Sequence, residues 1–397
     1  MNHTLAAVVA GMTLAGAWGV WGVGMPATAL AQSIPLSPTA QASGALITFD
    51  QGIEFVTIGS PGNAAFNGMP PPGGGGGSAS GRGAVDYEYR IGRFEVTTAQ
   101  WVEFFNAALD RPASDRLPHV FPPGAWGAVG APAQNGGQRF RVPAGNEMRP
   151  VGNEMRPVGN ISWRMAAMYC NWLHNDKSSD RAAFLNGAYD VITFSYIGNI
   201  FQDQLTHHSG ARYWIPTWDE WIKAAHYDPN RHGEGQGGYW AYSTTSDDQP
   251  IFGPPGAFGG LAQTNCCWDQ LTHPGMNPFA IPLGAYPTVQ SPWGLLDASG
   301  ATSEWTEDVL TAGGPLSERY RRLDGTSWGS PSGSIVGDHI RTEAFDEFPS
   351  ISLRDYGFRI VSTVPAPGTV TVMLVCCVSA LVHRRRARSQ SERASPC

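Results

Sequence analysis

The sequence has few charged residues and an acidic balance. Only 15% of its 397 residues are Asp, Glu, Lys or Arg, and the formal net charge is −7. Such a chain lacks the basic face that a nucleic-acid-binding protein needs, so we expect no nucleic-acid partner. A coiled coil or helical bundle is disfavoured as well, because those folds are rich in Ala, Glu, Lys and Leu.

Cysteine is scarce, and its placement excludes a disulfide framework. Three of the six cysteines lie near the C-terminus, and the rest are Cys170, Cys266 and Cys267. Three residues, two of them adjacent, cannot form such a framework. Cys170 falls in a helical pattern and is predicted to be a small buried apolar residue. For Cys266 and Cys267, two packed thiols, a vicinal disulfide and a soft-metal site all remain open.

Sequence motifs of several large enzyme classes are also missing. The chain contains no His-Glu-x-x-His pattern and no phosphate-binding loop. His207 and His208 are adjacent in a polar stretch, and we expect them to be solvated surface residues rather than metal ligands.

Glycine and proline are abundant, with 49 and 31 residues. The chain can still fill a core, because 42% of it is hydrophobic and it has 14 Trp. These counts predict a compact, loop-rich fold whose turns need Gly and Pro. Residues 70–83 are predicted to be a flexible loop, and the heptapeptide GNEMRPV, duplicated over 145–158, is assigned no function.

The N-terminus is predicted to be a secretory signal peptide over residues 1–31. This segment has no charged side chain, an apolar run from Leu5 to Val23 and small residues before Gln32. An uncleaved anchor is the alternative. A polar linker is predicted over 32–48, and the folded domain over 49–363.

Residues 364–397 carry a second predicted signal. Val-Pro-Ala-Pro precedes an apolar run over 370–382, and four arginines follow between 384 and 388. As a helix the run is too short for a hydrocarbon core of about 30 Å, so a short membrane tail is the alternative. The order resembles an exosortase-type (PEP-CTERM) sorting signal. It implies an exosortase-type processing enzyme, transient membrane association, and export to the periplasm, cell surface or extracellular matrix.

Local patterns predict strands near both 53–57 and 87–95, where apolar and polar residues alternate. Three helices have readable start signals. They run from a Thr97 or Thr98 cap to Ala108, from Trp163 to His174 after Ser162, and from Trp218 to His226 after a Thr217 capping box with Glu220.

Six segments occur in an order that resembles the sulfatase-modifying factor family, also called formylglycine-generating enzyme-like. They are Tyr89–Asn106, Pro157–Leu173, Arg212–Ala225, Trp293–Trp305, Leu323–Trp328 and Tyr356–Val361. The resemblance covers about residues 51–362. It implies an α+β fold, a variant of the C-type lectin fold, loop-rich with short strands and a few helices.

The resemblance also implies where catalytic residues would lie. The family's oxidases bind Cu(I) through two cysteines, whose positions here are Ser330 and Ile335. Neither side chain can replace a thiolate ligand, so we expect neither copper nor formylglycine-generating activity. Ser327 and Trp305 match pocket residues of the family, and with Ser330 they define a pocket that is predicted to persist without that chemistry.

Calcium is the cofactor that the resemblance implies, since oxygen ligands suit this ion. The first site would use the carbonyls of Gly300 and Thr302 and the carboxylate of Glu304. Alternatively, Glu304 caps a turn or pairs with an arginine. A second, weaker site is predicted from the following set: Asn265, the Cys266 carbonyl, Asn277 and the Phe279 carbonyl.

Three functions follow from this reading. The missing cysteines and the sorting tail favour an exported module that binds a ligand or partner, such as a glycan or another exported protein. The retained Ser327 and Trp305 favour an enzyme with different chemistry that assists maturation of an exported protein. A structural matrix component is the third alternative.

Overall fold

The computed structural model describes most of the predicted domain. The described residues are 46–68, 79–122, 127–143, 153–197, 200–266, 280–311, 319–329, 339–341 and 344–365. They all belong to one compact unit of the chain. The predicted signal peptide and the C-terminal apolar run lie outside them. Within these residues no helix has the length and apolarity needed to cross a membrane.

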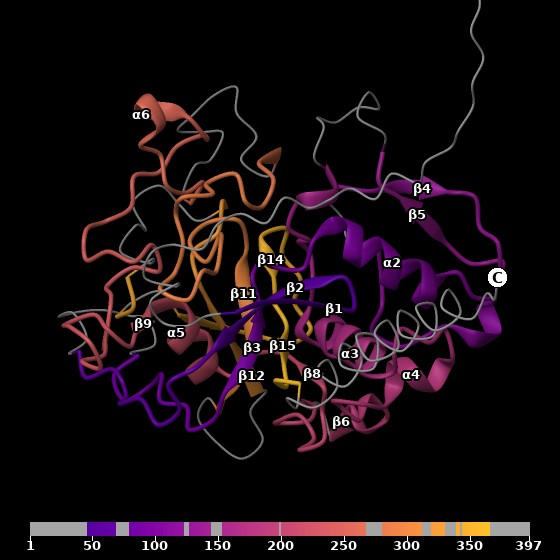
Figure 1. The fold of residues 1–397 in the computed structure, drawn as a ribbon. Coiled ribbons are helices and arrows are strands. Elements are labelled where there is room, and N and C mark those ends of the chain that lie inside the picture. The colour runs from indigo at the N-terminus through magenta and orange to yellow at the C-terminus, as the bar shows by residue number, and fades with distance from the viewer. Residues whose placement is uncertain are drawn as a thin grey trace, which may run out of the picture. The chain divides into compact units, whose positions relative to one another are not determined.

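A five-stranded sheet joins the two ends of the domain. Its order is β1 (Ile47–Asp50), β2 (Ile53–Ile58), β3 (Tyr89–Gly92), β15 (Val361–Ser362) and β8 (Tyr213–Trp214). β1 and β2 form a hairpin whose turn residues, Gln51 and Gly52, both have positive φ, as a two-residue hairpin turn requires. β1 begins two residues before the predicted boundary of the domain. The C-terminal strand β15 therefore pairs with an early strand on one side and a middle strand on the other (Figure 1).

A second sheet has four strands. Its order is β13 (Phe345–Glu347), β12 (Arg319–Asp324), β11 (Ser303–Thr311) and β14 (Tyr356–Gly357). β11 pairs antiparallel with β12, but the register shifts between Trp305 and Val309. This irregularity bends the strand and changes the directions of the side chains between the two residues.

The three predicted helices are confirmed. They are α2 (Thr98–Leu109) after Thr97, α3 (Trp163–His174) after Ser162, and α5 (Trp218–His226) after Thr217. The Thr217 hydroxyl accepts from the Glu220 backbone N–H, so the predicted capping box is present. In the view of Figure 1, α2 and α3 lie on one side of the central strands and α5 on the other.

The remaining elements are short, as an α+β, loop-rich fold implies. The helical turns are η1 (Ala113–Asp115), η2 (Asn153–Met155), α4 (Arg181–Leu185), η3 (Val191–Thr193) and α6 (Ala257–Gly260). The two-stranded pairs are β4 (Val129–Ala131) with β5 (Arg139–Arg141), β6 (Ser195–Ile197) with β7 (Ile200–Gln202), and β9 (Tyr227–Asp228) with β10 (Gly238–Tyr239).

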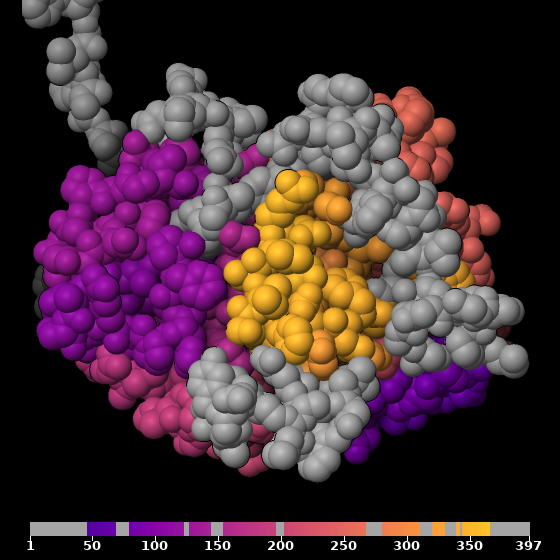
Figure 2. Space-filling model, turned by 180° about the vertical axis from the view of Figure 1, so that it is seen from behind, coloured from indigo at the N-terminus to yellow at the C-terminus, as the bar shows by residue number. Residues whose placement is uncertain are grey.

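Buried aromatic side chains connect the helices to the C-terminal segment. The ring of Trp101 lies 5.4 Å from that of Tyr169 and 5.7 Å from that of Phe358, centroid to centroid. Cys170 is fully buried in the same core, as predicted. Figure 2 shows the C-terminal residues at the middle of one face, flanked by N-terminal segments. The core is therefore shared by the early, middle and late parts of the chain.

Candidate functional site

A surface pocket of about 550 Å³ lies where four distant segments meet. They are the chain before β3, the loop after β7, the start of α5 and the irregular part of β11. The lining residues are Arg82, Ala84, Val85, Asp86, Tyr87, Leu205, Thr206, Thr217, Asp219, Glu307, Asp308 and Val309.

The irregular part of β11 supplies two of the pocket's carboxylates. Glu307 and Asp308 both lie in the shifted stretch and both line the pocket. The Glu307 backbone N–H donates to the Pro216 carbonyl at 2.7 Å, which ties β11 to the start of α5. Asp308 accepts from the Trp218 backbone N–H at 2.6 Å, a favourable place for a negative charge at a helix N-terminus.

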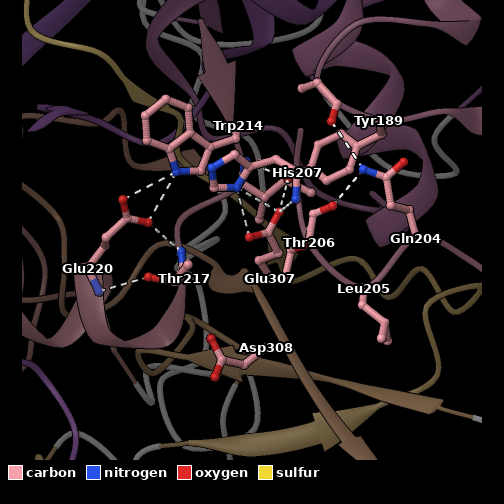
Figure 3. Close-up of polar contacts among 12 residues, drawn as sticks. Tyr189, Gln204, Leu205, Thr206, His207, Trp214, Thr217, Glu220, Glu307 and Asp308 are labelled. Carbon is pink, nitrogen blue, oxygen red and sulfur yellow. Dashed lines mark hydrogen bonds and ion pairs between the residues drawn. The ribbon is translucent and has the colours of Figure 1, made fainter. Parts of the chain in front are cut away.

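Glu307 holds His207 behind the pocket wall, next to the lining residue Thr206. Its carboxylate accepts from the His207 backbone N–H at 2.6 Å and lies 2.9 Å from the ring Nδ1, while the Tyr189 hydroxyl donates to it at 2.8 Å (Figure 3). The imidazole also stacks on Trp214, with ring centroids 4.6 Å apart. Burial lowers the pKa of His207, but the hydrogen bond and charge of Glu307 and the charge of Glu220 raise it above its usual value.

The prediction of two solvated histidines is therefore wrong for His207. Only 21% of its side chain is exposed, whereas His208 is exposed as predicted. The physical reason is the contact with Glu307, which lies 100 residues away in the sequence and gave no local signal.

Glu220 is a second buried carboxylate beside the same stack. It accepts from the Tyr87 hydroxyl at 3.0 Å, the Trp214 indole at 3.2 Å and the Thr217 backbone N–H at 2.7 Å. Burial is the main cause that raises the pKa of Glu220, and the charge of Glu307 adds to it. An imidazolium at His207 is thus favoured by two buried carboxylates and by the face of Trp214.

The pocket also contains one guanidinium. Arg82 contacts Asp219, with Nε 3.1 Å from Oδ1, and pairs with Asp308. Its guanidinium lies 4.9 Å from the centre of the Trp218 ring. The polar groups of the pocket are therefore held by one another, and the wall is formed before any ligand arrives.

Two of the residues predicted for the family's pocket are buried and hydrogen-bonded. The Trp305 indole donates to the Ile161 carbonyl at 2.6 Å, and the Ser327 hydroxyl donates to Asp355 at 2.7 Å. Residues 325–329 also match the Gly-x-Ser-x-Gly pattern of hydrolases, but Ser327 bonds to a carboxylate here rather than to an imidazole. Neither residue lines the 550 Å³ pocket. Ser330 and Ile335 lie outside the described residues, and the pocket role of all three predicted residues stays a prediction.

Glu304, the predicted calcium ligand, contacts an arginine. Arg359 donates from Nε to one carboxylate oxygen at 2.6 Å and from Nη2 to the other at 2.7 Å, and the Trp221 indole donates at 3.0 Å. Both charged side chains are buried, with 0% and 1% of the side chain exposed. This geometry agrees with the alternative prediction, in which Glu304 pairs with an arginine. As the side chains lie, the carboxylate does not fit a calcium ion, because the guanidinium occupies both oxygens.

Two further buried carboxylates surround this ion pair. Burial, and then the charge of Glu304, raises the pKa of Glu95, which accepts two hydrogen bonds from Thr302. Burial also raises the pKa of Asp297 to about 6, and the charge of Glu304 adds to that effect. Three acidic side chains thus lie near a single buried arginine.

The remaining predicted ligands lie partly within the described chain. Asn265 accepts from the Ala301 backbone N–H at 2.7 Å, which brings the start of the second predicted site beside the first. A Cβ on Gly300, whose φ is +93°, would lie 2.3 Å from the Asn265 Oδ1. Cys266 is buried, and Cys267, Asn277 and Phe279 lie outside the described residues. No group of three or more His, Cys, Asp or Glu side chains within the described ranges is arranged to hold a metal. Calcium binding stays a prediction.

Sequence reasoning missed the pairing of His207 with Glu307, and it predicted an arginine beside Glu304 as an alternative without identifying Arg359. A single carboxylate in a strand is no signal by itself, and the register shift in β11 becomes visible only once β12 is paired with it. The Thr-x-x-Glu box did signal Glu220, but only as a helix cap and not as a group bonded to Tyr87 and Trp214.

One antiparallel sheet, one mixed sheet, a few short helices and a carboxylate-lined pocket define a loop-rich α+β domain of the kind that the six sequence segments indicate. The family model of the sulfatase-modifying factor enzyme 1-like domain matches residues 83–364, and the chain belongs to this family. A search of curated proteins found no match for the chain.

Solved structures with a related fold share little sequence with this chain. "Treponema denticola variable protein 1" is 19% identical, with a TM-score of 0.44, and the match covers 81% of this chain and 99% of that one. CarF is 17% identical, with a TM-score of 0.42, covering 79% and 98%. PvdO from Pseudomonas aeruginosa is 14% identical, with a TM-score of 0.42, covering 81% and 98%.

Proposed function

We propose that this chain is an exported member of the family that binds a ligand or a protein partner and does not oxidise cysteine. One observation carries the proposal: no cysteine lies between Cys267 and Cys376, so the motif that begins at Gly325 is not followed by a thiolate pair. Without two soft ligands the domain has no Cu(I) site of the kind that the family's oxidases use.

The 550 Å³ pocket supports binding as the role of the domain. Its polar groups are already held by the protein, so a ligand would meet a preformed wall. Tyr87 and Leu205 line it and keep 44% and 48% of their surface exposed. Exposed aromatic and apolar side chains beside ordered polar groups are typical of recognition surfaces.

The first experiment tests the loss of oxidase chemistry. The purified domain is incubated with Cu(I), O₂ and a sulfatase-type cysteine peptide, and aldehyde is measured by mass spectrometry. We expect no conversion. Turnover would contradict the proposal, and turnover that also survives copper removal would indicate a different oxidase chemistry.

The second experiment tests binding at the pocket. The domain is applied to glycan and peptide arrays, and each ligand that is found is titrated against Leu205→Glu and Leu353→Glu. The second variant is a matched control, since Leu353 is equally exposed at 47% but does not line the pocket. We expect only Leu205→Glu to weaken binding. Equal effects of the two variants, or no ligand at all, would contradict the proposal.

An enzyme with different chemistry is the second candidate, and the pair of Glu307 with His207 favours it. A carboxylate bonded to Nδ1 orients an imidazole as a general base or acid in many enzymes. Peptides that bind on the array are followed by mass spectrometry for a covalent change. A change that is lost in His207→Gln but kept in His208→Gln would favour the enzyme over the binding module.

Calcium binding belongs to the proposal as well. It rests on the resemblance to the family, and a calcium ion on Glu304 would have to displace the Arg359 guanidinium. Tb³⁺ serves as a calcium probe, because the Trp221 indole lies 3.0 Å from the Glu304 carboxylate and would sensitise its luminescence. We expect luminescence that calcium displaces, and a higher melting temperature with calcium. Absence of both would contradict calcium binding.

The proposal also includes export, directed by a signal at each terminus. We expect the mature chain to begin at Gln32 and to be processed near residue 364 by an exosortase-type enzyme, after transient membrane association. Mass spectrometry of the protein recovered from the native host tests both ends. An intact N-terminus would indicate an uncleaved anchor, and an intact C-terminus would indicate a membrane tail.

A further inference from the structure

A second pocket, of about 390 Å³, lies at the C-terminal end of α2. It shares no lining residue with the 550 Å³ pocket. The end of α2, the η1 turn, the loop over 117–122 and the chain before β5 surround it. Figure 1 shows α2, β4 and β5 on the same side of the molecule.

Apolar side chains form part of the wall of this pocket, and polar groups form the rest. Leu109, Leu117, Val120, Phe121 and Pro122 line it, and Phe121 keeps 41% of its surface exposed. Removing such apolar surface from water favours a bound apolar group.

The floor of the pocket is held in place. The Asp110 carboxylate accepts from the backbone N–H groups of Gln134, Asn135 and Gly137 at 3.0, 2.9 and 3.3 Å. A Cβ on Gly137 would lie 2.0 Å from the Leu109 carbonyl oxygen, so only glycine allows this close approach. The cavity is therefore preformed, as in most small-molecule sites.

Arginines outnumber carboxylates around the pocket, although the chain as a whole is acidic. Arg111 donates to the Ala107 carbonyl at 3.2 Å and to Asp115 at 2.7 Å. Arg181 lies 3.4 Å from Asp115, and Arg139 lies 3.4 Å from Asp110. Two carboxylates thus occupy three of the guanidinium groups.

Arg116 differs from these three. Its side chain lines the pocket, is exposed, and has no hydrogen-bond or ion-pair partner within the part of the chain that the structure describes. An unpaired guanidinium beside a cluster of apolar side chains is suited to an amphipathic carboxylate, which it can bind through two parallel hydrogen bonds. One guanidinium would balance the charge of a doubly charged phosphate less completely than that of a carboxylate.

We propose that this pocket binds an amphipathic carboxylate, with the apolar body against Leu117, Val120 and Phe121 and the carboxylate on Arg116. The inference goes beyond the proposed function, because it assigns a ligand class to a different pocket. The same chemistry is present in a free apolar acid and in the C-terminus of a peptide that ends in an apolar residue, and the probes below separate these sources.

The test measures binding of octanoate, octan-1-ol, acetyl-Leu-Phe with a free carboxylate, and the amide of that dipeptide to the full chain by calorimetry. We expect at least one carboxylate to bind about tenfold more tightly than its uncharged counterpart, since one charge-assisted pair accounts for such a factor. Octanoate alone would identify a free acid, and the dipeptide alone a peptide C-terminus.

Variants of Arg116 and Phe121 locate the two halves of the site. Arg116→Gln is expected to weaken carboxylate binding about tenfold, with partial recovery in Arg116→Lys. Arg354→Gln is the control, because this exposed arginine lies over Trp328 away from the pocket. Phe121→Ala should weaken the acid and its uncharged counterpart equally.

Three outcomes would overturn the inference: no binding of either carboxylate, equal binding of the charged and uncharged probes, or unchanged binding in Arg116→Gln. Loss of carboxylate binding in Arg116→Gln would support it even if the arrays find no ligand for the other pocket, so the two proposals fail separately.

Discussion

At the scale of single residues, buried charged side chains have the largest effect on the stability of this protein. Arg359 is fully buried and also donates to the carbonyls of Gly92 and Leu296, so its guanidinium is surrounded by acceptors. Glu304 supplies the compensating charge. A buried charge without its partner is costly, whereas an exposed pair contributes little.

Glu304→Gln tests this difference at the scale of one residue. The substitution keeps the shape of the side chain but removes the carboxylate charge that Arg359 hydrogen-bonds, so we expect a loss of about 3–5 kcal/mol in the free energy of unfolding. Urea denaturation measures it. The control is Glu103→Gln, which removes the partner of Lys177 from a pair whose carboxylate side is 52% exposed and should cost less than about 1 kcal/mol. Equal losses in the two variants would contradict the argument.

His207 predicts how stability depends on pH. Its pKa is raised in the folded state above an unfolded value of about 6.5, so folding favours the imidazolium. The contribution is therefore complete below about pH 6.5 and is lost as pH rises through the folded pKa. We expect the melting temperature of the wild type to fall between about pH 6 and pH 8.5 by more than that of His207→Gln.

The neighbouring His208 provides the control for that experiment. Asp297 and Glu220 also have raised pKa values, so their contributions to stability likewise fall as the pH rises. Only the difference between the wild type and the variant therefore isolates the contribution of one histidine. His208→Gln should follow the wild type. A His207→Gln curve parallel to that of the wild type would show that the pair with Glu307 does not titrate as inferred.

At the scale of elements, helix starts were readable because their signals are local. A hydroxyl that accepts from a backbone N–H three residues later is encoded within four positions, as with Thr97, Ser162 and Thr217. The strands were harder, because β8, β14 and β15 each span two residues and exist only through their neighbours. Pairing across the sheet, not propensity, defines them.

The cap of α5 gives a prediction at this scale. Thr217→Ala removes the acceptor of the Glu220 backbone N–H, and we expect it to cost about 1 kcal/mol of stability. Thr217→Ser keeps a hydroxyl at the same place and should cost only part of that. Chemical denaturation of both variants is the measurement, and equal losses would point to the lost methyl group rather than the cap.

On the scale of the whole molecule, the C-terminal strand holds the fold together. Val361 pairs with Ile91 on one side and Trp214 on the other, and it is fully buried. The sheet therefore closes only after nearly the whole domain has been synthesised, and its contacts are long-range ones.

Truncation tests this dependence on the last strand. A chain that ends after Ile360 lacks β15 and is expected to lose its cooperative thermal transition. A chain that ends after Pro365 keeps the strand and should melt like the full-length protein. Circular dichroism during heating distinguishes them, and cooperative melting of the shorter chain would contradict the proposed role of β15.

The sequence by itself determined the family, the start of each main helix and the absence of the cysteine pair, because each depends on residues close together along the chain. Only the tertiary structure decided that Glu304 faces Arg359, 55 residues later, and that Glu307 faces His207, 100 residues earlier. Charge pairs of this kind form where strands and loops bring distant side chains together in a low-dielectric interior, and no local pattern records the choice of partner.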